Sequence, residues 1–572
     1  MFPTNRILKT KDYQQPVACS VDQIDSAIDE LTKGAKSLEA SSIDHRIALA
    51  KQCLLGVARV ADDWVVAGCK AKKSGDTGPG IAEEYIGGPI AVLRFLHLTI
   101  ATLEDIRSKG NPCLPGSSKT VDGQLRVPVF PTKQLYDALA FMGLRAECWL
   151  EPGQTEDSMF GDSPLRLARK VPVHSKVELV LGAGNVSAIP ITDALTKIFH
   201  QDHVVLLKMN PVNEYLGPIF EDALKPIIDA GWLRIIYGDA TVGRHATYHP
   251  GVNCVHITGS VDTHEAIVWG SDLAERSQRK AQNNPLLSKP ISSELGNVTP
   301  WIVIPGEFTP KQLIAQVESV AASIINNASF NCIATKMIIT HRDWPQRKLF
   351  LSLLRELLEK TPVRYGYYPG AADRHHQFSG MNLVDVAGKL PWVLKTDLTL
   401  ENDLQMFERE SFVCVVGECN LEADGPVEFL NKAVALANEK MTGTLAAAVT
   451  VPDEFAETHA GELDQAIQNL RYGTIGVNQW PALGFAWMSP PWGGYPGASL
   501  EDVQSGIGSV HNTFLLSKTQ KTVIYGKLTL FPKPVWFSTH ACPEWVAYKL
   551  FKLYASPSVL RLPGLFLAAL RG

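Results

Sequence analysis

Two short segments of the chain contain the residue types needed for covalent carbonyl chemistry. Residues 293–297 (Ser-Glu-Leu-Gly-Asn) contain Glu294, and residues 329–332 (Ser-Phe-Asn-Cys) end in a lone thiol. A thiolate attacks a carbonyl carbon, and a nearby carboxylate then activates water against the resulting thioester. We therefore expect Cys332 to be a nucleophile and Glu294 a general base. Alone, each has a simpler interpretation, as a buried structural thiol or a surface acid.

A glycine-containing loop and two strand ends are candidates for binding a dinucleotide. Residues 182–187 (Gly-Ala-Gly-Asn-Val-Ser) nearly match GxGxxG, so they form either a cofactor loop or a tight turn. Within this loop the Asn185 amide is a candidate donor to an oxyanion. Lys208 closes an apolar strand at the edge where open sheets bind ligands, although such a lysine also reaches solvent along its stem. Ser260 begins an expected helix, as a simple cap or as part of an anion site.

The apolar periodicity predicts a helical N-terminal region followed by alternating strands and helices. Residues 20–70 and 82–106 show helical spacing, and residues 110–175 combine strands with loops. From residue 176 onward, strands alternate with helices, the pattern of a parallel sheet with helical crossovers. This is the layout of nucleotide-binding α/β domains, so we expect the strand ends to position the candidate residues.

Composition and charge argue against several classes of protein. With 572 residues, 45% of them hydrophobic, the chain exceeds a single core and should divide into domains. Its net charge of −5 argues against a nucleic-acid partner. We recognise no signal peptide and no apolar run long enough to span a membrane. The ten cysteines lack metal-ligand spacing, so we expect no metal and a reduced, cytoplasmic protein.

Five segments, taken in order, resemble motifs of the aldehyde dehydrogenase superfamily. The resemblance covers about residues 176–497. The family motifs are the strand that ends in a ribose-binding lysine, Phe-Thr-Gly-Ser, Glu-Leu-Gly-Gly-x-x-Pro, Glu-x-Phe and Gly-x-x-x-x-Asn. The similar segments here are 206–208, 257–260, 294–300, 410–412 and 473–478.

The resemblance implies an oxidation of an aldehyde to a carboxylic acid by NAD(P)+. Cys332 would add to the aldehyde, Asn185 and the Cys332 backbone N–H would hold the oxyanion, and Glu294 would activate the hydrolytic water. The resemblance also implies residues that bind the adenosine ribose, the pyrophosphate and the nicotinamide end of the cofactor. These cofactor-binding residues are Lys208, Gly259, Ser260, Glu410 and Phe412.

The resemblance also implies an α/β fold with a Rossmann-type cofactor domain, an α/β catalytic domain and a small β oligomerisation element. Residues 1–295 would form the dinucleotide-binding domain, with a β-rich oligomerisation excursion near 120–170. Residues 296–480 would form the catalytic domain. Residues 481–572 would return to the cofactor and oligomerisation region and end in an apolar extension. A homodimer or homotetramer is expected.

Several positions depart from the family pattern. Ala183-Gly184 replace a usual Pro-Trp before the asparagine, which predicts a different shape for the oxyanion loop. Pro211 stands where many members carry a glutamate for the ribose hydroxyls, and Glu214 is the nearest acid. We expect NAD as the cofactor, while NADP stays open.

The aldehyde itself is expected to be apolar. Phe330 replaces a usual glycine near the thiol and would narrow the site or line a substrate tunnel. Together with Trp480, Phe485 and Trp487 it indicates a medium-chain, long-chain or aromatic substrate.

Two other functions compete with aldehyde oxidation. An acyl-CoA or acyl-phosphate reductase would use the same thiol in the reverse direction, but such an enzyme benefits from excluding a hydrolytic base, so Glu294 favours oxidation. A non-catalytic α/β binding protein with remnant motifs is the third hypothesis.

The aromatic and basic C-terminal tail has two interpretations. It packs on a neighbouring subunit or forms an amphipathic surface that meets lipid. At the level of sequence we favour packing, because Pro563 interrupts the final helix.

Overall fold

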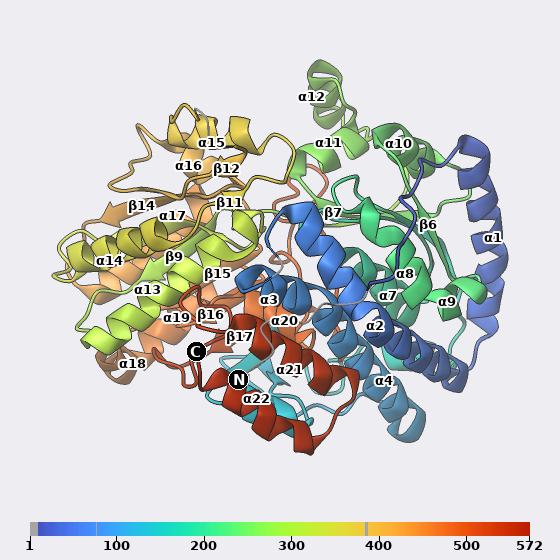
Figure 1. Cartoon of the computed structure of the whole chain (residues 1–572), viewed down its shortest axis with the longest axis horizontal. Helices are drawn as coiled ribbons and strands as arrows, with labels where there is room; N and C mark the ends of the chain where they lie inside the picture. Colours follow the sequence, from blue (N-terminus) through green and yellow to red (C-terminus); the bar gives the residue numbers. More distant parts are fainter. Residues whose placement is uncertain (1–9, 76, 384–386) are drawn as a thin grey trace.

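The computed structural model describes residues 10–75, 77–383 and 387–572. Two sheets with helices packed around them make up the molecule, and N-terminal and C-terminal helices cover the region between them (Figure 1). The α/β fold expected from the sequence is confirmed.

The N-terminal region is helical, as the apolar periodicity predicts. Ser20 and Gln23 form a capping box that starts the first helix, in which each side chain satisfies the other residue's backbone N–H. The elements are α1 (Val21–Ala40), α2 (Ile43–Lys72), α3 (Pro79–Tyr85), the π-helical turn η1 (Ile86–Ile90) and α4 (Ala91–Lys109). Within the described residues, one helical stretch, Pro79–Lys109, passes a length and composition test for crossing a membrane, but 78% of its most apolar window is buried inside the protein.

The cofactor sheet has five parallel strands in the order β6-β5-β4-β7-β8. Its strands are β4 (Val177–Leu181), β5 (Val204–Lys208), β6 (Leu233–Ile236), β7 (Cys254–Gly259) and β8 (Ile291–Leu295). The connecting helices are α7 (Ile189–Gln201), η2 (Glu214–Leu216), α8 (Gly217–Ala223), α9 (Lys225–Asp229), α10 (Ala240–Tyr248), α11 (Val261–Trp269) and α12 (Leu273–Ala281). Because helices cover both faces, the central strands are apolar runs, and all of β5 is buried.

The second sheet has ten strands in the order β1-β2-β3-β17-β16-β15-β9-β10-β14-β13. The parallel part comprises β9 (Thr299–Val303), β10 (Thr335–His341), β13 (Val393–Lys395), β14 (Val415–Leu421), β15 (Ala446–Thr450), β16 (Thr474–Val477) and β17 (Thr519–Tyr525). An antiparallel excursion, β1 (Lys119–Val121), β2 (Gln124–Phe130) and β3 (Arg145–Leu150), extends this sheet through the β3–β17 pair.

Helices and short turns complete this half of the molecule. They are α5 (Leu135–Ala140), α6 (Ser163–Leu167), α13 (Pro310–Ile325), η3 (Asn326–Ser329), α14 (Arg347–Lys360), α15 (Ala371–Ser379), α16 (Leu404–Glu408), α17 (Pro426–Lys440), α18 (Asp453–Thr458), α19 (Ala460–Asn469) and α20 (Ala482–Trp487). A separate two-stranded sheet pairs β11 (Arg364–Tyr365) with β12 (Lys389–Leu390).

The C-terminal extension packs back on the N-terminal helices. It contains α21 (Pro543–Ala555), η4 (Val559–Arg561) and α22 (Leu562–Ala569), and α21 contacts α3 and η1. A buried network anchors it: the Arg94 guanidinium pairs with Asp137 at 2.5 Å and donates to the Tyr554 hydroxyl at 2.6 Å. The tail therefore belongs to the same core as α4.

Candidate active site

The candidate nucleophile and base come from different sheets and meet at one point. Glu294 lies in β8 of the cofactor sheet, and Cys332 lies in the loop between η3 and β10 of the second sheet. The Cys332 thiol donates to Glu294 Oε1 at a distance of 3.5 Å. Glu294 is buried, and its other carboxylate oxygen has no hydrogen-bond partner among the described residues. The arrangement therefore combines a thiol with an uncompensated carboxylate.

The electrostatics of this pair follow from burial. Burial, with the nearby negative charge of Asp193 adding to it, raises the pKa of Glu294 to about 8. Burial and the neighbouring carboxylates Glu294 and Glu410 raise the pKa of the Cys332 thiol well above its usual value. A carboxyl group whose pKa lies near neutral pH exchanges protons readily, as a general base must.

Behind Glu294 lies a buried polar cluster that the sequence reasoning missed. Asp193 of α7 accepts a hydrogen bond from Thr258 (2.8 Å), and the His256 and His511 rings lie 3.5 Å and 3.6 Å from its carboxylate. Thr258 is the strand partner of Glu294. Burial alone would raise the pKa of Asp193, but the close contacts with the two histidine rings lower it below its usual value, so Asp193 stays ionised beside Glu294. An acid inside the mainly apolar helix 189–199 was the available sequence signal.

The loop before Cys332 has an unusual backbone. Three consecutive non-glycine residues, Asn327, Ala328 and Ser329, have φ of 51°, 54° and 67° in the left-handed region. Such conformations cost free energy and persist where surrounding contacts hold them. The Asn327 amide donates to the carbonyls of Asn185 (3.0 Å) and Phe330 (2.9 Å), and the Lys72 ammonium donates to Asn327 Oδ1 (3.1 Å). These contacts hold the nucleophile loop against the oxyanion loop.

Lys336 ties the nucleophile loop to the loop that carries Glu410 and Phe412. Its buried ammonium donates to the Ser329 carbonyl (3.2 Å), the Ser329 hydroxyl (2.8 Å) and the Val413 carbonyl (2.9 Å). Burial lowers the pKa of Lys336 to about 8, opposed by the negative charge of Glu410. Sequence reasoning missed this residue, although a lysine within the apolar run 333–340 was a visible signal.

Asn185 lies beside the nucleophile loop, but its amide is engaged. Its Nδ2 donates to the Phe330 carbonyl at 3.2 Å. Its own carbonyl accepts from the Lys72 ammonium at 2.9 Å, and Lys72 also pairs with Glu84 at 2.7 Å. The oxyanion loop is thus held in place from the end of α2, a contact that no local sequence pattern indicates.

Two cavities meet at the thiol and the carboxylate. One, of about 470 Å³, is lined by α3, the end of α13, α20 and residues 535–539 of the C-terminal extension. We call it the substrate cavity. The other, of about 780 Å³, follows the carboxyl ends of the cofactor-sheet strands, and we call it the cofactor cleft. Cys332 and Glu294 line both.

The aromatic residues expected to line a substrate tunnel divide into two groups. Trp480 and Phe485 do line the substrate cavity. The expectation that Phe330 and Trp487 also line this cavity is wrong. Phe330 is fully buried and packs against Tyr367 and Tyr368, which places it in a core rather than in the cavity wall. Trp487 is likewise fully buried and stacks on a phenylalanine ring of β2.

All the cofactor-binding residues implied by the resemblance line the cofactor cleft: Lys208, Gly259, Ser260, Glu410 and Phe412. Ser260 caps α11 by accepting a hydrogen bond from the Thr263 N–H at 3.2 Å, so a helix N-terminus opens into the cleft. Glu410 Oε1 is a buried oxygen without a hydrogen-bond partner in the described part of the chain. A cleft with these features fits a dinucleotide.

A second acid near Lys208, Asp239, was missed by the sequence reasoning, which named Glu214. Asp239 lines the cleft and caps α10, whereas Glu214 lies in η2 outside the cleft lining. Burial lowers the pKa of Lys208, and the negative charges of Glu214 and then Asp239 oppose this shift.

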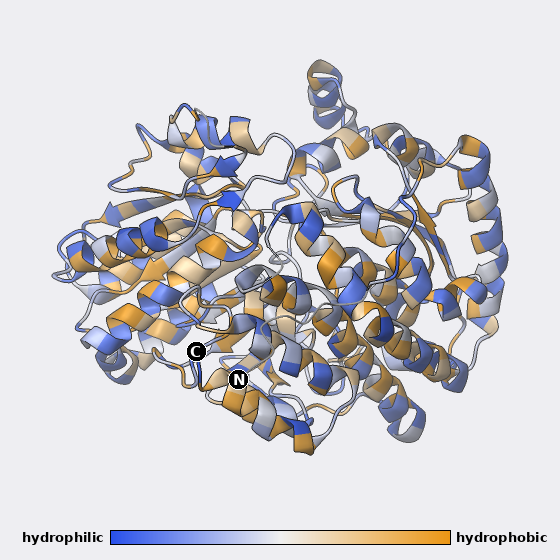
Figure 2. Cartoon of the chain, viewed as in Figure 1, coloured by the Kyte–Doolittle hydropathy of each residue, from blue (hydrophilic) through white to orange (hydrophobic). Residues whose placement is uncertain are grey.

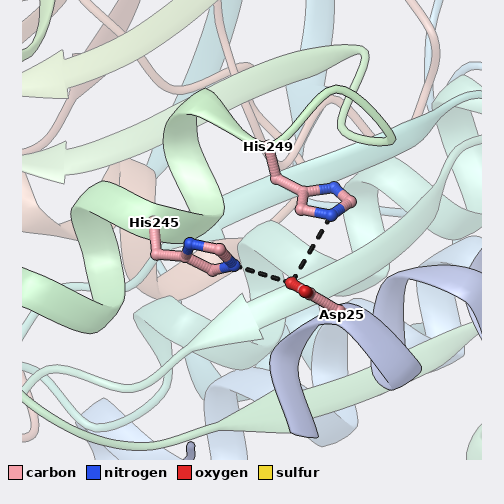
Figure 3. Close-up of side chains that lie close together, drawn as sticks. All are labelled: Asp25, His245 and His249. Atoms are coloured by element: carbon pink, nitrogen blue, oxygen red, sulfur yellow. Dashed lines mark hydrogen bonds and ion pairs between the residues drawn. The ribbon is translucent and has the colours of Figure 1, made fainter. Parts of the chain in front are cut away.

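A separate cluster of potential metal ligands lies outside both cavities. Asp25 of α1 faces two histidines of the α10 region, His245 at 2.6 Å and His249 at 3.5 Å (Figure 3). The His249 Nδ1 accepts a hydrogen bond from the Gly251 N–H, so the neutral ring carries its proton on Nε2, the atom that faces Asp25. The contacts of Asp25 with the two histidines tie α1 to the α10 region.

Comparisons with known proteins agree with this geometry. Residues 204–370 match the family model described as "Aldehyde dehydrogenase family". An aldehyde dehydrogenase from Brucella melitensis biovar abortus 2308 is similar in structure, with a TM-score of 0.57 and 17% identity over 89% of this chain and 90% of that one. No curated protein is significantly similar in sequence.

Two further solved structures share the fold. An NADP-dependent glyceraldehyde-3-phosphate dehydrogenase from Bacillus halodurans C-125, complexed with NADP, has a TM-score of 0.58 and 16% identity over 89% of this chain and 92% of that one. A lactaldehyde dehydrogenase from Escherichia coli has a TM-score of 0.57 and 15% identity over 90% and 92%. At these identities the likeness shows the fold, and the family match over residues 204–370 adds the sequence pattern.

Together these findings show that the chain has the fold of the aldehyde dehydrogenases and that residues 204–370 match the sequence pattern of that family. The resemblance recognised in the sequence is thus supported over residues 204–370 by the family match and over most of the chain by the shared fold.

Proposed function

We propose that the protein oxidises an apolar aldehyde to the carboxylic acid through a thioester on Cys332. The observation that carries this proposal is the 3.5 Å contact between the Cys332 thiol and Glu294 at the junction of two cavities. A nucleophile and a base that share one point can form an acyl intermediate and then hydrolyse it. The apolar residues Trp480 and Phe485 in the wall of the substrate cavity favour a medium-chain, long-chain or aromatic aldehyde.

The chain's own residues divide the work. Lys208 and Ser260 would hold the ribose and pyrophosphate of NAD, and Glu410 and Phe412 would hold its nicotinamide end. When bound, the nicotinamide supplies a hydride acceptor. We assign NAD rather than NADP because Asp239 lines the ribose end of the cleft and would repel a 2′-phosphate.

The covalent steps fall to three residues. Cys332 releases its proton to solvent water, and its thiolate bonds to the aldehyde carbon as the carbonyl π bond opens, which leaves an alkoxide that the Asn185 amide and the Cys332 N–H stabilise. The Asn185 amide nitrogen carries two N–H groups, so one can donate to this oxygen while the other keeps the Phe330 carbonyl. After oxidation, Glu294 removes a proton from water as the water attacks the thioester, and the acid leaves with the thiol regenerated.

The same geometry weighs against an acyl-CoA or acyl-phosphate reductase. A reductase must protect its thioester from water, whereas Glu294 lies beside the thiol with one oxygen unpaired. The contact also weighs against a non-catalytic protein, because an unsatisfied buried carboxylate is costly without a use.

The test is the pre-steady-state behaviour of Glu294→Gln. We expect this variant to release about one equivalent of NADH per active site and then stall, because the thioester forms but is not hydrolysed. Cys332→Ser is the matched control and should show no burst. Steady turnover by Glu294→Gln at the wild-type rate contradicts the assignment of the base. Faster consumption of NADH with an acyl-CoA than production of NADH with the aldehyde would favour the reductase.

We also propose that the protein is a homo-oligomer of a reducing compartment such as the cytoplasm, with domains divided between residues 295 and 296. Its ten cysteines are all described and are free thiols. The proposed boundary lies between β8, the last strand of the cofactor sheet, and β9 of the second sheet.

A further inference from the structure

The end of the chain has a charge opposite to that of the protein. Residues 545–572 contain no Asp or Glu, although the whole chain carries a net charge of −5. Their charged side chains are all cationic: Lys549, Lys552, Arg561 and Arg571. A local excess of positive charge on an acidic protein marks a surface that attracts anions.

The same segment exposes large apolar side chains. Leu560 is 87% exposed, Leu567 62% and Val559 58%, and Leu565 is the only buried residue of α22. Figure 2 shows the hydrophobic residues along α22, at the lower edge of the molecule. The neighbouring α5 region, which α22 contacts, adds the exposed side chains of Leu139 and Met142. We call this surface the terminal apolar face. Contiguous exposed apolar side chains of this kind mark an interaction surface.

The segment that supports the terminal apolar face also lines the substrate cavity. Residues 535–539 line that cavity, and the chain then turns through His540 to Cys542. The Cys542 thiol contacts the carbonyls of Ala568 (3.8 Å) and Arg571 (3.9 Å), at the end of α22. One short segment therefore forms the cavity wall on one side and supports the terminal helix on the other.

The charge of residues 545–572 and the length of α22 indicate what binds to the terminal apolar face. A second copy docking through the same face would bring one cationic surface against another, which is repulsive. An anionic lipid surface is complementary in both charge and polarity. With eight residues, α22 is about 12 Å long by its 1.5 Å rise, too short to cross a bilayer core of about 30 Å. It can only lie in the interface.

We propose that the terminal apolar face docks on an anionic lipid surface and that lipid-dissolved aldehydes enter the substrate cavity beside it. The docking stands on the face alone, whereas the delivery of aldehyde rests on the proposed function. This reverses the sequence-based preference for subunit packing. Its reason is the exposed apolar surface of α22 together with the arginines that flank it, Arg561 and Arg571, and Pro563 at the start of the helix does not disturb either feature.

Vesicle flotation of the full-length protein tests the docking. We expect flotation with phosphatidylcholine vesicles that contain phosphatidylglycerol, and much less in 0.5 M salt or without the anionic lipid. Leu560→Ser/Leu567→Ser should reduce binding at least tenfold. Leu273→Ser, which alters an equally exposed leucine on α12, is the control and should not change it. Circular dichroism and gel filtration verify that both variants fold.

Two results would overturn the docking. One is a wild-type protein that never floats; if Leu560→Ser/Leu567→Ser then also changes from oligomer to monomer, the face is a subunit interface. The other is flotation that survives Leu560→Ser/Leu567→Ser.

Kinetics with two aldehydes test the delivery of aldehyde from lipid separately from the proposed catalytic function. With decanal presented in anionic vesicles, we expect Leu560→Ser/Leu567→Ser to lose most of the wild-type rate. With propanal in solution, both proteins should react equally. Equal rates with decanal in vesicles contradict the delivery of aldehyde from lipid. No turnover of either aldehyde by the wild type would instead contradict the proposed function and leave the flotation result to decide the docking.

Discussion

At the scale of single residues, Glu294 must be ionised to act as a base in a site that disfavours its charge. Burial and the charge of Asp193 raise its pKa to about 8. The ionised fraction of Glu294, which is the active base, therefore increases as the pH rises toward 8 and decreases as the pH drops below 8. Glu294 is therefore only partly ionised at neutral pH, but its ionised form is a stronger base than an ordinary carboxylate.

The pH dependence of deacylation follows from this balance. We expect the hydrolysis rate of the acyl-enzyme to rise with pH to a plateau, with a midpoint near 8. Asp193→Asn removes a like charge, so the pKa of Glu294 falls and the midpoint moves to lower pH by roughly one unit. Deacylation after a burst with p-nitrophenyl acetate measures both curves. An unmoved midpoint in Asp193→Asn contradicts the electrostatic link.

Lys336 is a positioning residue whose charge also favours the thiolate. Lys336→Met removes the contacts to Ser329 and Val413 together with a positive charge near Cys332. We expect alkylation of Cys332 by iodoacetamide at pH 7.5 to slow by roughly tenfold, equivalent to one pKa unit. Lys336→Arg retains the charge and should restore most of the rate. Peptide mapping of Cys332 follows the reaction, and equal rates in all three proteins would refute this role.

At the scale of elements, the end of β8 lies so close to the loop of Glu410 that only glycine fits between them. A Cβ on Gly296 would collide with the Glu410 carboxylate. Gly296→Ala should therefore displace Glu410 and weaken NAD+ binding by roughly tenfold, measured by quenching of tryptophan fluorescence. Gly243→Ala, in the same cleft but with open space around its Cβ, is the matched control. Equal affinity in both variants would contradict a cofactor role for Glu410.

Local patterns indicated the elements and the reacting pair, but not the residues that support them. The strands ending at Lys208 and Gly259 and the segment of Glu294 were predictable because periodicity and motif are contiguous in sequence. The contacts of Lys72 and Asp193 were not, because their meaning depends on what packs against them. Phe330 was placed wrongly for the same reason: an aromatic residue beside a nucleophile packs into a core or lines a cavity, and sequence does not distinguish the two.

At the scale of the whole molecule, the C-terminal extension closes a substrate cavity that the two sheets leave open. Trp536 of this extension lines the cavity wall. Trp536→Ala should enlarge the cavity and raise kcat/KM for bulky aromatic aldehydes relative to propanal by severalfold. Phe531→Ala alters an exposed aromatic residue of the same segment outside the cavity lining and should leave the ratio unchanged. Initial rates across an aldehyde series decide between these outcomes.

Intact-protein mass spectrometry tests the central claim most directly. After Glu294→Gln is mixed with an aldehyde and NAD+, we expect the protein mass to increase by one acyl group, located by peptide mapping on Cys332. The wild type under the same conditions should turn over with little adduct. An acyl group on another residue, or a wild-type protein that makes acid while Cys332 is blocked, would contradict the account.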